Sequence, residues 1–111
     1  MKNAFIRFLN LKHAAEIIPE ELDSTSLHLL EVCMLRNQLG NRLTVTEAMQ
    51  INKLASPATI HRKLNQLVEL KYLTHEFEGK NRRTKYLTPT SKSHEYFAKM
   101  GDLFIDGHQL S

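Results

Sequence analysis

The sequence predicts a mainly α-helical domain of the α+β class with one small β-hairpin. Apolar residues recur at helical spacing over most of the chain, whereas alternation of apolar and polar residues is confined to the region 73–88. A chain of 111 residues can bury one hydrophobic core. We therefore expect a single domain over residues 1–111, with a core at 23–89 and terminal helices at 1–22 and 90–111.

Two helices are expected in the first part of the chain. The first spans Lys2–Ile18 and ends at Pro19, because the residue before a proline is disfavoured in the helical region. The second begins after several possible caps at 23–26 and continues to about Leu39, with Gly40 as its stop. The second helix is apolar on nearly every side, so we expect its neighbours to cover most of it. Its apolar residues are Leu27, Leu29, Leu30, Val32, Cys33, Met34 and Leu35.

A helix-turn-helix is predicted next. Thr44 and Glu47 form a capping box for a short helix from Val45 to about Asn52. Ser56 then caps a longer helix over residues 57–70, whose first residue is a proline. Its buried face is predicted to comprise Ile60, Leu64, Leu67 and Val68. The opposite, exposed face comprises Ala58, Thr59, Arg62, Asn65, Gln66 and Glu69, and side chains of these types suit base contacts in a major groove.

A β-hairpin is predicted after this helix. Residues 73–78 alternate as in a half-buried strand, Gly79–Asn81 is a turn, and a return strand spans Arg82–Thr88 and ends at Pro89. A hairpin in this position would be the wing of a winged helix. Its tip and return strand carry four cations within six residues, which repel one another unless a polyanion lies nearby. These cations are Lys80, Arg82, Arg83 and Lys85.

Aromatic residues recur at both ends of the chain. The last helix is expected to begin at Thr90 or Ser91, with Gly101 as a candidate early stop and Gly107 as its end. Its apolar stripe comprises Tyr96, Phe97, Met100, Leu103 and Phe104. The first helix carries a similar stripe of Phe5, Phe8, Leu9 and Ala15. Two such faces on a short chain favour a homodimer formed through the N- and C-terminal helices.

Positive charge is concentrated in one part of the chain. Residues 1–52 hold 5 basic and 6 acidic side chains, residues 53–92 hold 9 and 3, and residues 93–111 hold 1 and 3. The middle segment coincides with the predicted helix-turn-helix and wing. A basic segment between near-neutral flanks is expected of a phosphate-binding face.

The residues favour no other class of function. Cys33 is the lone cysteine and the six histidines lie far apart, so no metal site is expected. We find no paired carboxylates, no Gly-rich phosphate loop and no nucleophile with a base in the sequence. We therefore expect no catalytic residues and no cofactor. No apolar run approaches the ~20 residues of a membrane span. No signal peptide is evident either, so a cytoplasmic protein is expected.

The order of elements from about Leu43 to Tyr96 resembles the winged helix-turn-helix regulators of the multiple-antibiotic-resistance (MarR) family. The matching motifs are Thr44-x-x-Glu47-Ala48, Ser56-x-x-Thr59-Ile60-x-Arg62-x-Leu64-x-x-Leu67, Asn81-Arg82-Arg83 and Thr90-x-x-Ser93. Two positions depart from the pattern. Lys71 stands where the family usually has a glycine after the recognition helix, and Asn81 replaces an aspartate of the wing.

This resemblance implies a sequence-specific, repressor-like regulator that binds double-stranded DNA as a homodimer. It places Ser56, Thr59, His61, Arg62 and Gln66 in or beside the major groove, and Lys80, Arg82, Arg83 and Lys85 on phosphates or a minor groove. Two alternatives stay open: a winged-helix module for protein–protein interaction, and a phage or plasmid replication or packaging protein with the same DNA surface. No polar cluster indicates a small-molecule effector, and the operator sequence is not evident.

Overall fold

The computed structural model describes residues 4–6, 9, 19–51, 53–80 and 82–110, and the chain divides into two compact units. One unit is Asp23–Ser93, and the other combines Met1–Leu22 with His94–Ser111. The predicted core at 23–89 falls within the first unit. Most of the predicted first helix lies outside the described residues, although residues 4–6 and 9 are helical.

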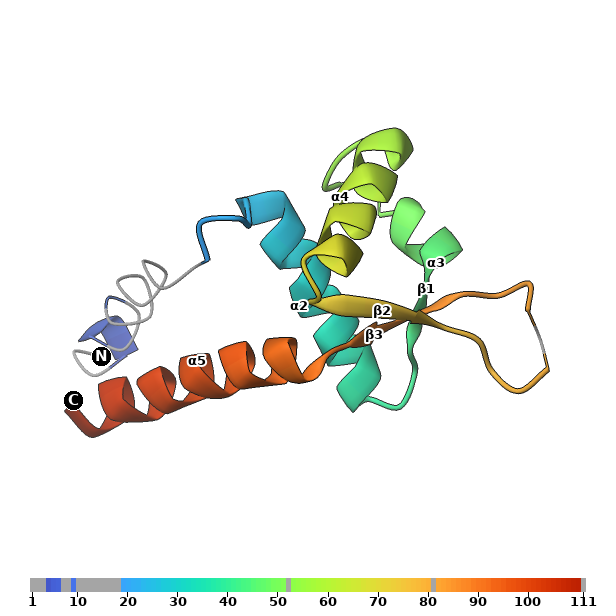
Figure 1. Ribbon diagram of the computed structural model, residues 1–111. Helices are drawn as coiled ribbons and strands as arrows, with labels where there is room; N and C mark the ends of the chain where they lie inside the picture. Colours follow the sequence, from blue (N-terminus) through green and yellow to red (C-terminus); the bar gives the residue numbers. More distant parts are fainter. Residues whose placement is uncertain (1–3, 7–8, 10–18, 52, 81, 111) are drawn as a thin grey trace. The chain divides into compact units, whose positions relative to one another are not determined.

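The elements form a mainly helical chain with one small sheet (Figure 1). In chain order they are α2 (Ser24–Gln38), β1 (Leu43–Thr44), α3 (Val45–Met49), α4 (Pro57–Glu69), β2 (Leu73–Glu76), β3 (Tyr86–Pro89) and α5 (Ser91–Leu110). The sheet is antiparallel with the order β1-β3-β2, so the last strand in sequence lies in its centre. The predicted α+β class is confirmed. No helix among the described residues is both long enough and apolar enough to cross a bilayer.

The aliphatic face of α4 lies at the centre of the core of the Asp23–Ser93 unit. Ile60, Leu64 and Leu67 are buried, as the helical spacing predicted, and α4 packs against α2, α3 and β2. The core is completed by buried residues of α2 and the sheet: Leu29, Leu30, Cys33, Leu43, Leu73 and Leu87. Full burial of an aliphatic side chain contributes about 1.5–3 kcal/mol. Packing of this face, more than helix propensity, therefore holds α4 in one orientation.

One prediction for α2 is wrong. Asp23 caps its first turn and Gly40 (φ +74°) follows its last, as the sequence indicated. Cys33 is buried, and burial raises the pKa of its thiol to about 12. Leu35 and Leu39 are 64% and 78% exposed, however, so the helix is not covered on most sides. The other elements pack against the face of α2 that carries the buried leucines, and an all-round apolar pattern cannot indicate which face that is.

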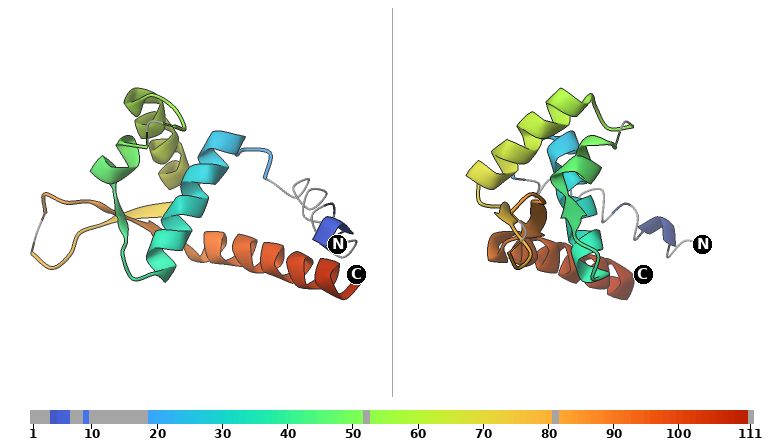
Figure 2. Two further views of the ribbon diagram at one scale, coloured as in Figure 1. Left: turned by 180° about the vertical axis from the view of Figure 1, so that it is seen from behind. Right: turned by 90° about the vertical axis from the view of Figure 1, so that its right-hand side faces the viewer.

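The β-hairpin is shorter than predicted. β3 begins at Tyr86 instead of Arg82, and its first residue pairs with Glu76, the last residue of β2. Residues 82–85 therefore lie beyond the end of β2. Together with residues 77–80 they belong to a connection, here called the hairpin loop, that extends beyond the sheet in the different views (Figures 1 and 2).

Two helix ends also differ from those predicted. α3 stops at Met49 rather than near Asn52, although its capping box is formed. α5 is capped by the side chain of Thr90 and continues through Gly101 and Gly107. A single glycine inside a helix costs only about 1 kcal/mol relative to alanine, so neither one has to end it.

A tight turn joins α4 to β2 and is held by the start of α5. Lys71 has φ +70°, the left-handed conformation that glycine adopts most easily. The N–H groups of Lys71 and Tyr72 donate back to carbonyls of the last turn of α4, at 3.1 and 2.9 Å, as in a Schellman motif. The Thr90 hydroxyl donates to the Lys71 carbonyl and the Ser93 hydroxyl donates to the Tyr72 carbonyl, both at 2.5 Å. These bonds keep a lysine in a conformation that would otherwise favour glycine.

The Lys71→Gly variant should be more stable than the wild type by about 1 kcal/mol, because a residue with a Cβ is strained at positive φ. The midpoint of urea or thermal unfolding measures this. Gly40→Ala is the matched control: Gly40 has a similar φ and nothing within 4 Å of an added Cβ, so strain alone should lower its midpoint. A clear drop for Lys71→Gly would contradict the strain at this turn.

Candidate nucleic-acid interface

The start of α4 is fixed by two of the predicted DNA-contacting residues. The Ser56 hydroxyl oxygen accepts from the Thr59 N–H at 3.3 Å, and the two hydroxyls are 3.0 Å apart. Pro57 occupies the first helical position, where it has no need of an N–H. Ser56 is exposed and Thr59 is half-buried. The Ser56 side chain therefore caps the helix and contacts the Thr59 hydroxyl, and both residues lie at the end of α4 that is predicted to meet the groove.

The exposed face of α4 carries the other predicted groove residues. His61, Arg62 and Gln66 are exposed, as are Asn65 and Glu69. The Asn65 amide nitrogen lies 3.5 Å from Nδ1 of His61, which orders two neighbouring side chains of this face. Arginine pairs well with guanine and glutamine with adenine in the major groove, so this face could discriminate between bases.

The hairpin loop carries the predicted phosphate-binding cations. Lys80, Arg82, Arg83 and Lys85 are all exposed, and Glu78 is the only carboxylate in the described part of the loop. The Arg82 guanidinium lies over the ring of Phe77, 5.4 Å from its centroid, in a cation–π contact. Asn81, which completes the predicted wing motif, lies outside the described residues. The four cations are thus in a loop and not on a return strand.

The pKa of His75 depends on charged residues of both α4 and the hairpin loop. It is half-buried in β2, opposite Leu87 of β3. Burial lowers the pKa of His75, and the positive charges of Lys85 and His61 lower it further. His75 is therefore within electrostatic reach of one residue of the exposed face of α4 and one at the base of the loop. The sequence indicated His75 only as a strand residue, because its neighbours depend on the β2–β3 register.

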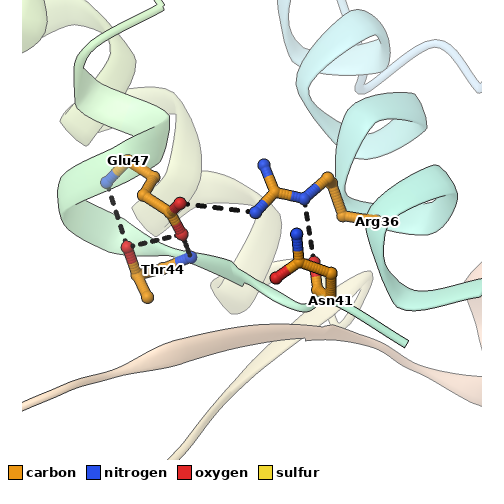
Figure 3. Close-up of polar contacts among 4 residues, drawn as sticks. All are labelled: Arg36, Asn41, Thr44 and Glu47. Atoms are coloured by element: carbon orange, nitrogen blue, oxygen red, sulfur yellow. Dashed lines mark hydrogen bonds and ion pairs between the residues drawn. The ribbon is translucent and has the colours of Figure 1, made fainter. Parts of the chain in front are cut away.

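An arginine of α2 ties down the start of α3 (Figure 3). Arg36 donates from Nε to the Asn41 carbonyl at 2.8 Å, and its Nη2 lies 3.3 Å from Oε2 of Glu47. The other carboxylate oxygen of Glu47 accepts from the Thr44 N–H at 3.0 Å, which completes the capping box. The hydrogen bonds from Thr44, followed by Arg36, lower the pKa of Glu47. The sequence predicted the capping box but not the link to α2.

Two further ion pairs hold the elements around α4. Arg42, the residue before β1, pairs with Glu76 of β2 at 3.0 Å and lies 4.6 Å from the centroid of the Tyr86 ring of β3. Lys63 of α4 pairs with Asp23, the cap of α2. Glu47 of α3 and Glu76 of β2 are thus each paired with an arginine.

No model of a known protein family matches this chain, and no curated protein matches it. The resemblance of its motifs to the MarR type thus stays a prediction. Among the described residues, no three His, Cys, Asp or Glu side chains lie close enough to hold a metal ion together.

The Asp23–Lys63 pair makes stability depend on pH. Hydrogen bonding from Lys63, then from the Ser26 N–H, lowers the pKa of Asp23 from 3.8 to about 2. A carboxylate whose pKa is lower in the folded state stabilises the fold above the unfolded pKa, and this stabilisation is lost as the pH falls through the folded pKa. Asp23→Asn keeps a good cap but loses the charge. It should be less stable than the wild type at pH 7, and the difference should shrink between pH 4 and pH 2.

Urea unfolding at a series of pH values measures this difference. Glu31→Gln, which changes an exposed carboxylate on the same helix, is the matched control and should follow the wild type closely. Parallel curves for Asp23→Asn and the wild type from pH 7 to pH 2 would show that the pair contributes nothing.

Proposed function

We propose that this protein is a cytoplasmic, repressor-like transcriptional regulator that binds duplex DNA sequence-specifically, with a winged helix-turn-helix resembling the MarR type. In this proposal α3 and α4 are the two motif helices and α4 is the recognition helix. The β2–β3 hairpin with its loop is the wing. The start of α4 would enter the major groove while the loop follows the backbone or the adjacent minor groove.

The observation that carries the proposal is the position of Arg62. Burial of the aliphatic residues of α4 leaves Arg62 and Gln66 in solvent, on a helix whose start is capped and whose sides are packed. Charges from both His61 of α4 and Lys85 of the hairpin loop lower the pKa of His75. A base-reading helix beside a phosphate-binding loop provides both the specificity and the affinity that DNA recognition needs.

We further propose that the protein acts as a homodimer through its terminal helices. In the unit that contains both chain ends, apolar side chains are exposed: Phe5 by 63%, Ile6 by 39%, Leu9 by 37% and Ile105 by 52%. Exposed apolar residues of this size often mark interaction surfaces. Of the predicted stripes, Tyr96 is buried and packs edge to face on the half-buried Phe97. The side chains of Phe8, Ala15, Leu103 and Phe104 lie outside the described ones.

A protein-interaction module is the second candidate, and the exposed leucines of α2 favour it. Leu35 and Leu39 lie one helical turn apart on a face that a protein partner could cover. Fluorescence polarisation with a random-sequence duplex at low salt discriminates between the two functions. A DNA-binding protein should bind with an affinity that falls steeply with salt, whereas a module for protein partners should not bind. A phage or plasmid replication or packaging protein would bind in the same way.

Base and phosphate contacts should respond differently to mutation. Arg62→Ala should weaken binding to the preferred duplex by about 1–3 kcal/mol and leave binding to random duplex nearly unchanged. The double variant Arg82→Ala and Arg83→Ala should weaken binding to both duplexes and reduce the slope of log K against log salt. Polarisation titrations at several salt concentrations measure both effects.

Lys99→Ala, an exposed cation of α5, is the control for the loss of one charge. It should change the salt slope less than the loop variants do. The loop variants are expected to lose affinity equally for the preferred and the random duplex. If Arg62→Ala does so too, the proposed division between base and phosphate contacts is contradicted.

A further inference from the structure

A cavity lies between the start of α3 and the hairpin loop. Its volume is about 410 Å³, and it is lined by Thr44, Val45, Thr46, Arg83, Thr84 and Lys85. Two of these residues are cations, three carry hydroxyl groups, and none is acidic. A water molecule occupies roughly 30 Å³ in the liquid, so the cavity has ample room for a hydrated phosphate group.

The walls of this cavity are joined by backbone hydrogen bonds. The Val45 N–H donates to the Lys85 carbonyl at 3.1 Å, and in the sheet Thr44 is the partner of Tyr86. The loop residues that line the cavity are therefore attached to α3 at their C-terminal end. A site held in this way needs little ordering when an anion enters it, which favours binding.

The nearest carboxylate in sequence is directed elsewhere. Glu47 follows Thr46, but its two oxygens are bound to Arg36 and to Thr44 (Figure 3). These contacts offset its charge and keep it on the side of α2. The residues that line the cavity bring two positive charges, those of Arg83 and Lys85, and no negative charge, which suits an anion.

We propose that this cavity holds one phosphate of the DNA backbone, an assignment that rests on the proposed function. Lys85 and Arg83 supply the positive charge, and the hydroxyls of Thr46 and Thr84 are the donors that fix the phosphate's position. Arg83 and Lys85 are then backbone anchors and not minor-groove readers. Arg82, which is stacked on Phe77, and Lys80, which lies nearer the tip, can then contact other phosphates of the DNA strand or the minor groove.

Methylphosphonate substitution tests this site, because it removes the charge of one phosphate at a time. The probe is a duplex enriched by selection from a random library, with each backbone phosphate replaced in turn. One substitution in each half-site should weaken wild-type binding several-fold. Lys85→Ala should weaken binding to the unmodified duplex by a similar factor and reduce the salt slope by about 1. Combined with that substitution, Lys85→Ala should cause little additional loss.

The matched variants are Thr46→Val and Lys80→Ala. Thr46→Val, which removes only the hydroxyl, should show the same non-additivity with the same phosphate. Lys80 does not line the cavity, so the loss in Lys80→Ala should add fully to that of this methylphosphonate. Thermal unfolding should confirm that these exposed positions leave the fold intact.

The two proposals fail in distinguishable ways. If the wild type binds duplex DNA but the effect of Lys85→Ala adds fully to that of every methylphosphonate, the phosphate site is wrong and the proposed function stands. If the wild type shows no salt-dependent binding to any duplex, the proposed function fails and the phosphate site with it.

Discussion

When Ile60, Leu64 and Leu67 leave water, they determine which side of α4 remains in solvent. The three side chains lie on one stripe of the helix, and α2, α3 and β2 close around them. Rotating α4 about its axis would expose these residues and bury Arg62, at a cost of several kcal/mol for the aliphatic burial alone. Hydrophobic packing at the core therefore sets the orientation of the polar side chains at the surface. The proposed reading of DNA by α4 depends on that orientation.

Charge is arranged around α4 in a complementary way. Three acids around α4 are engaged by cations from elsewhere in the chain: Glu47 by Arg36, Glu76 by Arg42 and Asp23 by Lys63. Half-exposed ion pairs such as those of Arg36 and Arg42 contribute little to stability on their own. Their effect here is on the electrostatic potential, because each pair offsets one negative charge near α4 or the sheet. The same pairs link α3 to α2, α4 to the cap of α2, and β2 to the residue before β1, so structural and electrostatic roles coincide.

Features that depend on local rules could be predicted from the sequence. The helical spacing of α4, the capping box at Thr44 and the stop at Gly40 each involve residues within a few positions of one another, and all agree with the structure. Features that depend on distant partners could not. The return strand was predicted too long because strand length is set by the opposite strand. The exposure of Leu35 was missed because an all-round apolar helix does not reveal its covered face.

The candidate site divides in the same way. The exposure of Arg62 and of the loop cations follows from sequence patterns, although their role in DNA binding stays a prediction. The contribution of His75 and the cavity between Thr46 and Lys85 could not be predicted, because both arise from the register of β3 against its two neighbours. The positive φ of Lys71 was expected only from its position in the resemblance, and it is tolerated because hydroxyls of α5 bind the turn.

Selection of bound duplexes from a random library, run in parallel with the wild type and Arg62→Ala, tests the central claim most directly. The account predicts that the wild type enriches a palindromic consensus whose half-sites lie about one helical turn apart. Arg62→Ala should lose the preference at one position of each half-site and keep the rest. A wild-type library without enrichment, or the same consensus from both proteins, would contradict the assignment of α4 as the helix that reads DNA.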